Sequence, residues 1–317
     1  VIVNAAVSNS GNISFVNGTC ECPNATVGDI DVIGGVTYTA VDDNSIAGEI
    51  ANGNVNLCTS LVTYMSFLFA GNSSFNSDIG FWDTSSVTNM GDLFQSAEAF
   101  NQDISGWDVS NVTNMSNTFK YARGFNQNIG GWNVSSVINM SAMFFEADDF
   151  NQDIGNWDVS NVTNMFAMFN SADDFNQNLT GWCVSSITSE PSDFAESSAL
   201  TEANKPIWGT CPDYNINVTA SSNSDYTLSG SDRNGNVTGD DPSININVGD
   251  EINFIVDAAS HPFYIKTVQG TGTDNQVSNV TNNGATSGVV NWTPTIAGTY
   301  YYQCSVHDGM YGTITVQ

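Results

Sequence analysis

The stretch FNQDISGWDVSNVTNMSNTFKYARG, residues 100–124, decides the fold of the larger part of the chain because its landmarks return every 25 residues. Three residue series carry this period. They are the phenylalanines Phe75, Phe100, Phe125, Phe150 and Phe175, the tryptophans Trp82, Trp107, Trp132, Trp157 and Trp182, and the methionines Met65, Met90, Met115, Met140 and Met165. A unit this short cannot bury an apolar face alone, so neighbouring copies must stack on one another.

Two apolar spacings within the copy predict its secondary structure. An L-x-x-L-x-L spacing favours a strand, and apolar residues three and four apart favour a helix. The residues concerned are Ile104, Trp107 and Val109 for the strand, and Val112, Met115 and Phe119 for the helix. The sequence therefore predicts an α/β leucine-rich-repeat-like solenoid with parallel strands over residues 61–212.

Polar residues also recur with the repeat. An asparagine directly before each helix-face methionine can cap the helix or join a ladder of side chains along the stack. These are Asn89, Asn114, Asn139 and Asn164. A second set, Asp78, Asp103 and Asp153 with Asn128 and Asn178, is interpreted as a solvated face in preference to a calcium-binding edge, because it has no glycine-punctuated ligand loop.

The segment FNQDISGWDVSNVTNM resembles the repeat of BspA-type leucine-rich-repeat surface proteins, which is also found in mycoplasma-type surface lipoproteins. The resemblance covers roughly residues 58–212. It implies display outside the cell and often adhesion, and it implies no catalytic residues.

Both ends of the repeat array look like caps. Residues 20–60 form the predicted amino-terminal cap, in which CPNATVGDIDVIGGVTYTAVDD reads as a strand hairpin turning at Gly34-Gly35. We expect the disulfides Cys22–Cys58 and Cys183–Cys211, one closing each end, with a stabilisation of about 3 to 4 kcal/mol each. Cys20 is then left over, as a free thiol, a bond to another molecule or an alternative partner of Cys22.

The first 19 residues, VIVNAAVSNSGNISFVNGT, form a predicted β-prone arm. Docking on the rest of the same chain is the conservative interpretation. Addition as a strand to a neighbouring subunit is the alternative, and it predicts a homo-oligomer or homopolymer.

Composition limits the possible partners. The 317 residues carry 5 Lys+Arg against 33 Asp+Glu, a net charge of −28, which disfavours nucleic acid and anionic membranes. No apolar run is long enough to span a bilayer, and a chain starting at Val1 without a signal-peptide pattern is expected to be a mature, processed one.

Cysteines and sequons predict a secreted or cell-surface protein. The glycosylation candidates are Asn12, Asn17, Asn24, Asn72, Asn133, Asn178, Asn217, Asn236 and Asn279.

Residues 213–317 leave the repeat and alternate β-branched and aromatic residues between turn signals, which predicts an all-β sandwich. Both histidines of the chain lie here. Two histidines exclude a three-histidine zinc site and make a Ser/His/Asp triad a poor expectation. With Cys304 and Met310, His261 and His307 make the His₂Cys set with a weak axial Met that is typical of a type 1 copper site, whose task is one-electron transfer.

The segments HPFYIKT and AGTYYYQCSVHDGMYGTITV resemble plastocyanin-like cupredoxins, with the compact Cys-x₂-His-x₂-Met spacing of amicyanin. The resemblance implies a Greek-key β-sandwich with copper held by His261, Cys304, His307 and Met310. Pro262 departs from the family, because many plastocyanins have a hydrogen-bonding Asn there.

Three functions follow from the sequence. The first is a non-enzymatic extracellular structural or adhesive protein that displays a cupredoxin domain and assembles into a fibril or layer. The second is a secreted blue-copper electron-transfer or copper-binding protein anchored by its repeats. The third is a surface module that binds a glycan or another partner through the repeats.

Overall fold

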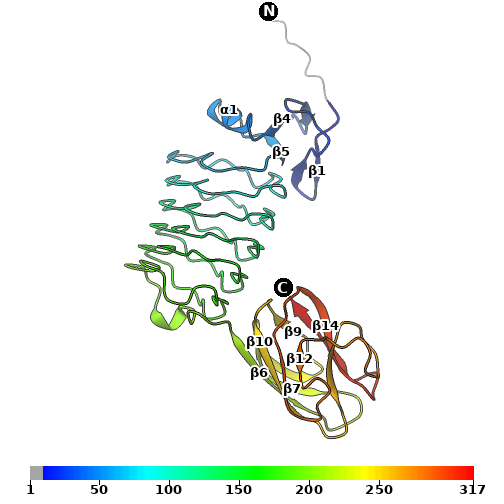
Figure 1. Ribbon diagram of the computed structural model, residues 1–317. Helices are drawn as coiled ribbons and strands as arrows, with labels where there is room; N and C mark the ends of the chain where they lie inside the picture. The colour runs from blue at the N-terminus through cyan, green and yellow to red at the C-terminus, as the bar shows by residue number, and fades with distance from the viewer. Residues whose placement is uncertain (1–9) are drawn as a thin grey trace, which may run out of the picture. The chain divides into compact units, whose positions relative to one another are not determined.

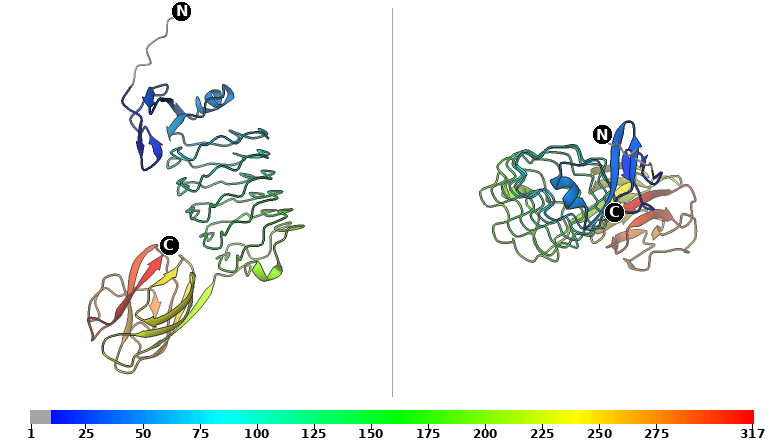
Figure 2. Two further views of the ribbon diagram at one scale, coloured as in Figure 1. Left: turned by 180° about the vertical axis from the view of Figure 1, so that it is seen from behind. Right: turned by 90° about the horizontal axis from the view of Figure 1, so that it is seen from above.

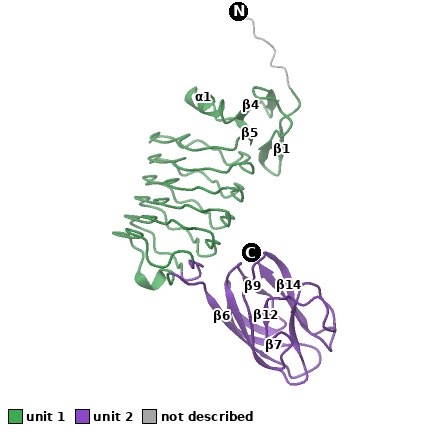
Figure 3. Cartoon of the chain, in the orientation of Figure 1, with its two compact units in different colours: residues 1–179, 186–208 green, residues 180–185, 209–317 purple. Residues whose placement is uncertain are grey.

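A computed structural model describes residues 10–317, so residues 1–9 of the predicted arm lie outside the described part. The chain divides into two compact units (Figure 3). Unit 1 extends to Leu179 and also contains Ser186–Trp208. Unit 2 comprises Thr180–Ser185 and Gly209–Gln317. The segment Thr180–Ser185, which belongs to the last repeat by sequence, is thus part of unit 2.

Unit 1 begins with a small β-rich cap (Figure 1). Its elements are β1 (Ser14–Val16), β2 (Thr19–Glu21), β3 (Ile30–Ile33), β4 (Val36–Asp42), α1 (Ile46–Ala51) and β5 (Leu57–Leu61). β3 and β4 form the expected antiparallel hairpin, and the turn at Gly34 and Gly35 has the positive φ angles that favour glycine. β4 then pairs in parallel with β5, which leads into the repeats.

The described residues of the arm dock on the cap of the same chain. The buried carboxylate of Asp31 accepts hydrogen bonds from the backbone N–H groups of Gly11, Asn12 and Ile13 and from the hydroxyl of Ser10. β1 and β2 pair with each other, and the N–H of Cys20 donates to the carbonyl of Phe81. Residues 10–19 therefore follow the conservative interpretation, while strand exchange between subunits stays a prediction.

The predicted α/β leucine-rich-repeat-like solenoid is wrong. Among the described residues the only helices are α1 and the 3₁₀ helix η1 (Glu202–Asn204), and no repeat contains either the predicted helix or a continuous strand. The copies are instead irregular turns stacked side by side (Figures 1 and 2). They are joined by isolated parallel bridges from Tyr64 to Asn89 and onward along the asparagines Asn114, Asn139 and Asn164.

Backbone geometry explains why the helix does not form. In the segment where Val112, Met115 and Phe119 predict it, Asn117 and Tyr121 have φ angles of 55° and 60°. A right-handed helix needs negative φ throughout, so these two residues close separate turns. The N–H groups then reach the next copy, as Met115 donates to the carbonyl of Asn139 at 2.9 Å.

Aromatic stacking forms the core of the repeats. The rings of Phe94 and Phe119 are stacked with centroids 5.6 Å apart, and those of Phe100 and Phe125 are 5.9 Å apart. The buried tryptophans Trp107, Trp132 and Trp157 also bond the preceding copy, as the indole N–H of Trp132 donates to the carbonyl of Ile104. The 25-residue period is therefore explained by one aromatic set per rung, although the secondary structure differs from the prediction.

The structure also contains a second asparagine ladder, which was not predicted from the sequence. The side-chain oxygen of Asn126 accepts the backbone N–H of Asn151 and the amide of Gln152, 25 and 26 residues on. The same pattern recurs at Asn76, Asn101 and Asn151, and the side-chain oxygen of Asn176 accepts the N–H of Thr201 and the amide of Asn204. The Phe-Asn-Gln triplet opening the repeats was the available signal.

The other repeated polar residues act within the backbone. Asn89 and Asn114 join a ladder, with the amide of Asn114 donating to the side-chain oxygen of Asn89, so the capping alternative does not apply. Asp103 and Asp153 each accept the N–H two residues on, at Ser105 and Gly155. Within residues 10–317 these positions contribute to no metal-binding cluster.

Unit 2 consists of two sheets around one core. Its strands are β6 (Asp213–Thr219), β7 (Thr227–Asp232), β8 (Gly235–Asp240), β9 (Ile244–Ile246), β10 (Glu251–Asp257), β11 (Phe263–Lys266), β12 (Val280–Thr281), β13 (Ser287–Trp292), β14 (Gly298–Cys304) and β15 (Tyr311–Val316). The sheet orders are β12-β13-β10-β6-β7-β8 and β11-β14-β15-β9. Alternating buried side chains, such as Ile252, Phe254 and Val256 of β10, form the shared core.

The structure contains two disulfides, Cys22–Cys58 and Cys183–Cys211, and these are the pairs expected from the cap positions. Cys20 and Cys304 are free and buried. Within the described residues, no helix has the length and apolar character needed to cross a bilayer.

Candidate metal centre

The pairing of β11 with β14 brings distant segments of the chain together. Phe263 at the start of β11 lies opposite Cys304 at the end of β14. His261 precedes β11 by two residues, while His307 and Met310 follow Cys304 in the loop to β15. All four predicted ligands therefore lie at one end of this strand pair.

Local hydrogen bonds fix the backbone at His261. Its N–H donates to the carbonyl of Ala258 at 2.9 Å, which closes a turn after β10. Its carbonyl accepts the hydroxyl of the fully buried Tyr226 at 3.0 Å. Burial raises the pKa of Tyr226 far above its usual range, with the adjacent Cys304 as the next cause, so this hydroxyl keeps its proton.

Three predicted ligand side chains converge. The Nδ1 atoms of His261 and His307 lie 3.2 Å apart, and Nδ1 of His307 lies 3.5 Å from Sγ of Cys304. One donor atom of each residue lies within 4.8 Å of the other two. Within residues 10–317, no other set of His, Cys, Asp and Glu side chains forms such a group.

Met310 joins the centre through its backbone and its burial. The N–H of Cys304 donates to the carbonyl of Met310 at 2.9 Å, so the ligand loop closes on itself. The Met310 side chain is fully buried within the core cluster that also contains Cys304. A buried thioether on this loop could add a weak fourth donor to a metal held by the other three residues.

The donor set fits a single first-row metal ion. Two nitrogens each about 2.0 Å from one ion lie at most about 4 Å apart, and a thiolate at about 2.3 Å allows slightly more. The separations of 3.2 Å and 3.5 Å satisfy both limits. One thiolate with two imidazoles favours copper or zinc over magnesium or calcium, which prefer oxygen ligands.

The protonation state of His261 also suits a ligand. Burial lowers the pKa of His261, and the neighbouring His307 lowers it further because two imidazolium charges would repel. The neutral imidazole is the form that donates a lone pair to a metal. His261 is 8% exposed and Cys304 is fully buried, whereas His307 is half-buried and faces solvent in part.

A neighbouring loop supports the ligand loop from outside. The buried ammonium of Lys266 donates to the carbonyls of Gly270 and Gly272. The N–H of Gly272 in turn donates to the carbonyl of Ser305, the residue after Cys304, at 2.7 Å. Burial lowers the pKa of Lys266.

Pro262 also contacts the ligand loop, because its carbonyl accepts the N–H of Ser305. Tyr226 and Lys266 were both missed in the sequence analysis, since their roles depend on contacts made only in the folded domain.

The nine glycosylation candidates are all exposed, and their occupancy stays a prediction. Cys20 is fully buried, and burial, aided by the negative charge of Asp83, raises the pKa of its thiol to about 12. A thiol in this state is a poor nucleophile, so its location favours the free-thiol alternative over a bond to another molecule.

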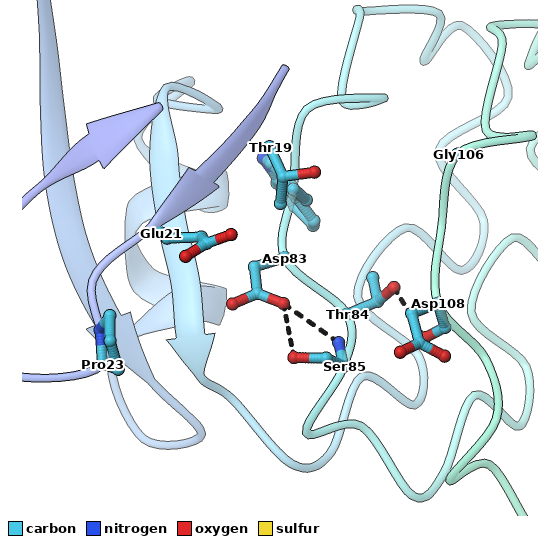
Figure 4. A pocket seen from close by; sticks show the side chains of 9 residues that line it. Thr19, Glu21, Pro23, Asp83, Thr84, Ser85, Gly106 and Asp108 are labelled. Atoms are coloured by element: carbon cyan, nitrogen blue, oxygen red, sulfur yellow. Dashed lines mark hydrogen bonds between the residues drawn. The ribbon is translucent and has the colours of Figure 1, made fainter. Parts of the chain in front are cut away.

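Unit 1 also contains a polar hollow (Figure 4). It measures about 390 Å³ and is lined by Thr19, Glu21, Pro23, Trp82, Asp83, Thr84, Ser85, Gly106 and Asp108. The carboxylate of Asp83 already accepts the hydroxyls of Ser60 and Ser85. Trp82 is only 1% exposed, so the hollow offers no aromatic surface to a ligand.

Comparisons with known proteins cover both parts of the chain. Residues 43–137 and 106–208 match the family described as "Mycoplasma protein of unknown function, DUF285". These matches together span more than half of the chain. No curated protein matches.

Solved structures of rusticyanin are also similar to part of the chain. One, described as a copper protein, is 23% identical with a TM-score of 0.23, covering 34% of this chain and 80% of its own. Rusticyanin from Thiobacillus ferrooxidans is 21% identical with a TM-score of 0.23, covering 33% of this chain and 76% of its own.

Proposed function

This chain belongs to the DUF285 family, and we propose that it combines the repeats of that family with a type 1 copper centre that transfers single electrons. The observation that carries the proposal is the convergence of Nδ1 of His261, Nδ1 of His307 and Sγ of Cys304. Bound copper would supply a one-electron couple between its two oxidation states.

The chain's own residues supply the environment for that couple. Cys304 and Met310 are fully buried, so their sulfur atoms are shielded from water. Two hydrogen bonds hold the ligands in place without a metal. The N–H of Cys304 donates to the carbonyl of Met310, and the hydroxyl of Tyr226 donates to the carbonyl of His261. A rigid donor set changes little between oxidation states, which favours fast electron transfer.

His307 gives the centre its access to solvent, because it is the only one of the three clustered ligands that is not buried. The net charge of −28 would steer a basic redox partner toward the protein. We place the protein outside the cell, on the grounds of its two disulfides, its exposed sequons and the resemblance of its repeats to surface proteins.

The test is copper binding by the full chain. We expect one copper per chain after reconstitution with Cu²⁺, and an intense visible band from thiolate-to-copper charge transfer. Cys304→Ser should abolish the band, while Cys20→Ser, which changes the other free cysteine, should leave it unchanged. A wild-type chain that takes up no copper, or takes it up without a thiolate band, would refute the proposal.

A structural role for the repeats is the second candidate, and the continuous asparagine ladder favours it. Hydrogen bonds from each copy to the next, as from Gln127 and Gln152, make the array a stiff scaffold for display or adhesion. Negative-stain microscopy of the native protein would show ordered polymers if the chain also assembles with itself, and dispersed particles if it does not.

A further inference from the structure

Gln303 is a buried polar residue directly before Cys304. It is fully buried although glutamine is usually exposed. Side chains alternate along a strand, and Tyr302 and Cys304 both belong to the core between the two sheets. Gln303 therefore points to the opposite face of β14, where the ligand loop folds over it.

The amide nitrogen of Gln303 lies inside the curve of that loop. Its two N–H protons are shared among four carbonyl oxygens, those of His307 at 3.0 Å, Met310 at 3.1 Å, Cys304 at 3.2 Å and Asp308 at 3.4 Å. The first three are the three candidate ligands that the loop provides. One side chain thus bonds the backbone of every ligand except His261.

The orientation of this amide follows from its surroundings. Four carbonyl oxygens would repel the amide oxygen, so the nitrogen must face the loop. The oxygen Oε1 is then buried without a hydrogen-bond partner among the described residues. Leaving a buried acceptor unpaired costs free energy, and the four carbonyl contacts offset that cost.

We propose that Gln303 is the positioning residue of the metal centre, because its amide fixes the loop from Cys304 to Met310 before a metal arrives. A loop that is already ordered does not lose conformational freedom when the ligands close on an ion. The role in metal binding rests on the proposed function, whereas the ordering of the metal-free loop does not.

Two measurements on the metal-free full chain test the ordering. In the wild type, the side-chain amide protons of Gln303 should exchange with solvent much more slowly than those of Gln276, which is exposed and donates to one carbonyl, that of Thr273. Equal exchange rates would overturn the proposal without any variant. In Gln303→Met, the backbone amides of Cys304 and Met310 should exchange faster than in the wild type, while β6 and β10 keep their rates.

Metal binding supplies the second readout. Removing an outer partner of metal ligands typically costs about 10- to 100-fold in affinity, and we expect a loss of that size for Cu²⁺ in Gln303→Met. Gln276→Met is the matched control and should bind as the wild type does. An unchanged affinity together with unchanged loop exchange would overturn the role of Gln303.

The two proposals fail in different ways. If the wild type binds no copper, the proposed function fails, and the exchange measurements still decide whether Gln303 orders the loop. If Gln303→Met does not fold, the wild-type exchange of the Gln303 amide decides. If the wild type shows the thiolate band and Gln303→Met shows the same band, affinity and loop exchange, only the positioning role fails.

Discussion

Phe263 and Cys304 lie directly opposite each other across β11 and β14, although one stands near His261 and the other begins the loop of His307 and Met310. This pair joins the two halves of the candidate metal centre. The ligands therefore meet only after the sheet has formed, and metal affinity depends on folding. Substitutions that loosen this end of the domain should weaken metal binding without touching a ligand.

Tyr226→Phe should destabilise unit 2 by about 1 to 3 kcal/mol, because it leaves the carbonyl of the buried His261 without its donor. Tyr300→Phe is the matched control, since it removes an exposed tyrosine–carbonyl bond to Ile296. Urea unfolding of both variants measures the difference. Equal losses in the free energy of unfolding would show that the buried Tyr226 hydrogen bond stabilises the domain no more than the exposed Tyr300 hydrogen bond does.

Asp250→Asn should lower the free energy of unfolding by about 3 to 5 kcal/mol. Asp250 is fully buried and pairs with Arg233, whose side chain is 3% exposed, so the substitution leaves a buried positive charge uncompensated. The exposed pair of Arg123 and Glu146 provides the control, and Glu146→Gln should cost less than about 1 kcal/mol. Thermal melting followed by circular dichroism compares them, and similar losses would contradict the prediction.

Asn126→Ala should destabilise the repeats by about 1 to 2 kcal/mol, because the N–H of Asn151 loses its acceptor and the amide of Gln152 keeps only the backbone carbonyl of residue 126. Asn126→Asp keeps an acceptor oxygen and should recover most of the loss. Denaturant unfolding of unit 1 is the measurement. If the Ala and Asp variants are both as stable as the wild type, the ladder does not stabilise the repeats.

Asp31 should contribute a pH-dependent stability to the amino-terminal cap. Hydrogen bonds from the backbone N–H of Gly11, and also from Ile13, Ser10 and Asn12, lower the pKa of its carboxyl below the ordinary value of 3.8, against the opposing effect of burial. A lowered folded-state pKa gives stability that is present above the unfolded value and lost as the pH falls through the folded value.

Asp31→Asn should therefore be less stable than the wild type at neutral pH, and the difference should shrink below about pH 4. Unfolding curves between neutral pH and about pH 2 measure it, with Asp257→Asn as a charge-matched control on an exposed strand end. A difference that is independent of pH would show that the contacts of Asp31 do not depend on its charge.

Cys20 should resist alkylation in the native protein. Its burial and the pKa of about 12 leave almost no thiolate at neutral pH. Iodoacetamide labelling of the full chain followed by peptide mapping should modify Cys20 only after unfolding in urea. Rapid labelling in the native state would instead favour an exposed thiol available to another molecule.

Much of the candidate centre was predictable from the sequence because its residues are rare. The chain has only two histidines, and Cys304, His307 and Met310 stand at a compact spacing in one loop. The supporting residues were not predictable, since the contacts of Gln303 and Tyr226 exist only after distant strands have paired. Polar residues beside a metal motif carry no periodic signal of their own.

The repeats show the opposite case, in which the period was evident and the secondary structure was misread. Apolar residues at spacings of three and four arise in a helix and also in successive tight turns. The positive φ angles fall on residues such as Tyr121, Ala142 and Glu146, which the sequence does not mark as left-handed. Side-chain ladders stabilise these turns, and a helix would not form such ladders between copies.

The asparagine ladder has a consequence for how such proteins vary. Each rung bonds residues 25 positions apart, so every internal rung presents the same donors and acceptors to its neighbours. Removing 25 residues between equivalent positions joins matching surfaces, whereas a deletion one residue shorter misaligns every later rung. Unequal recombination between copies can therefore lengthen or shorten the array by whole rungs.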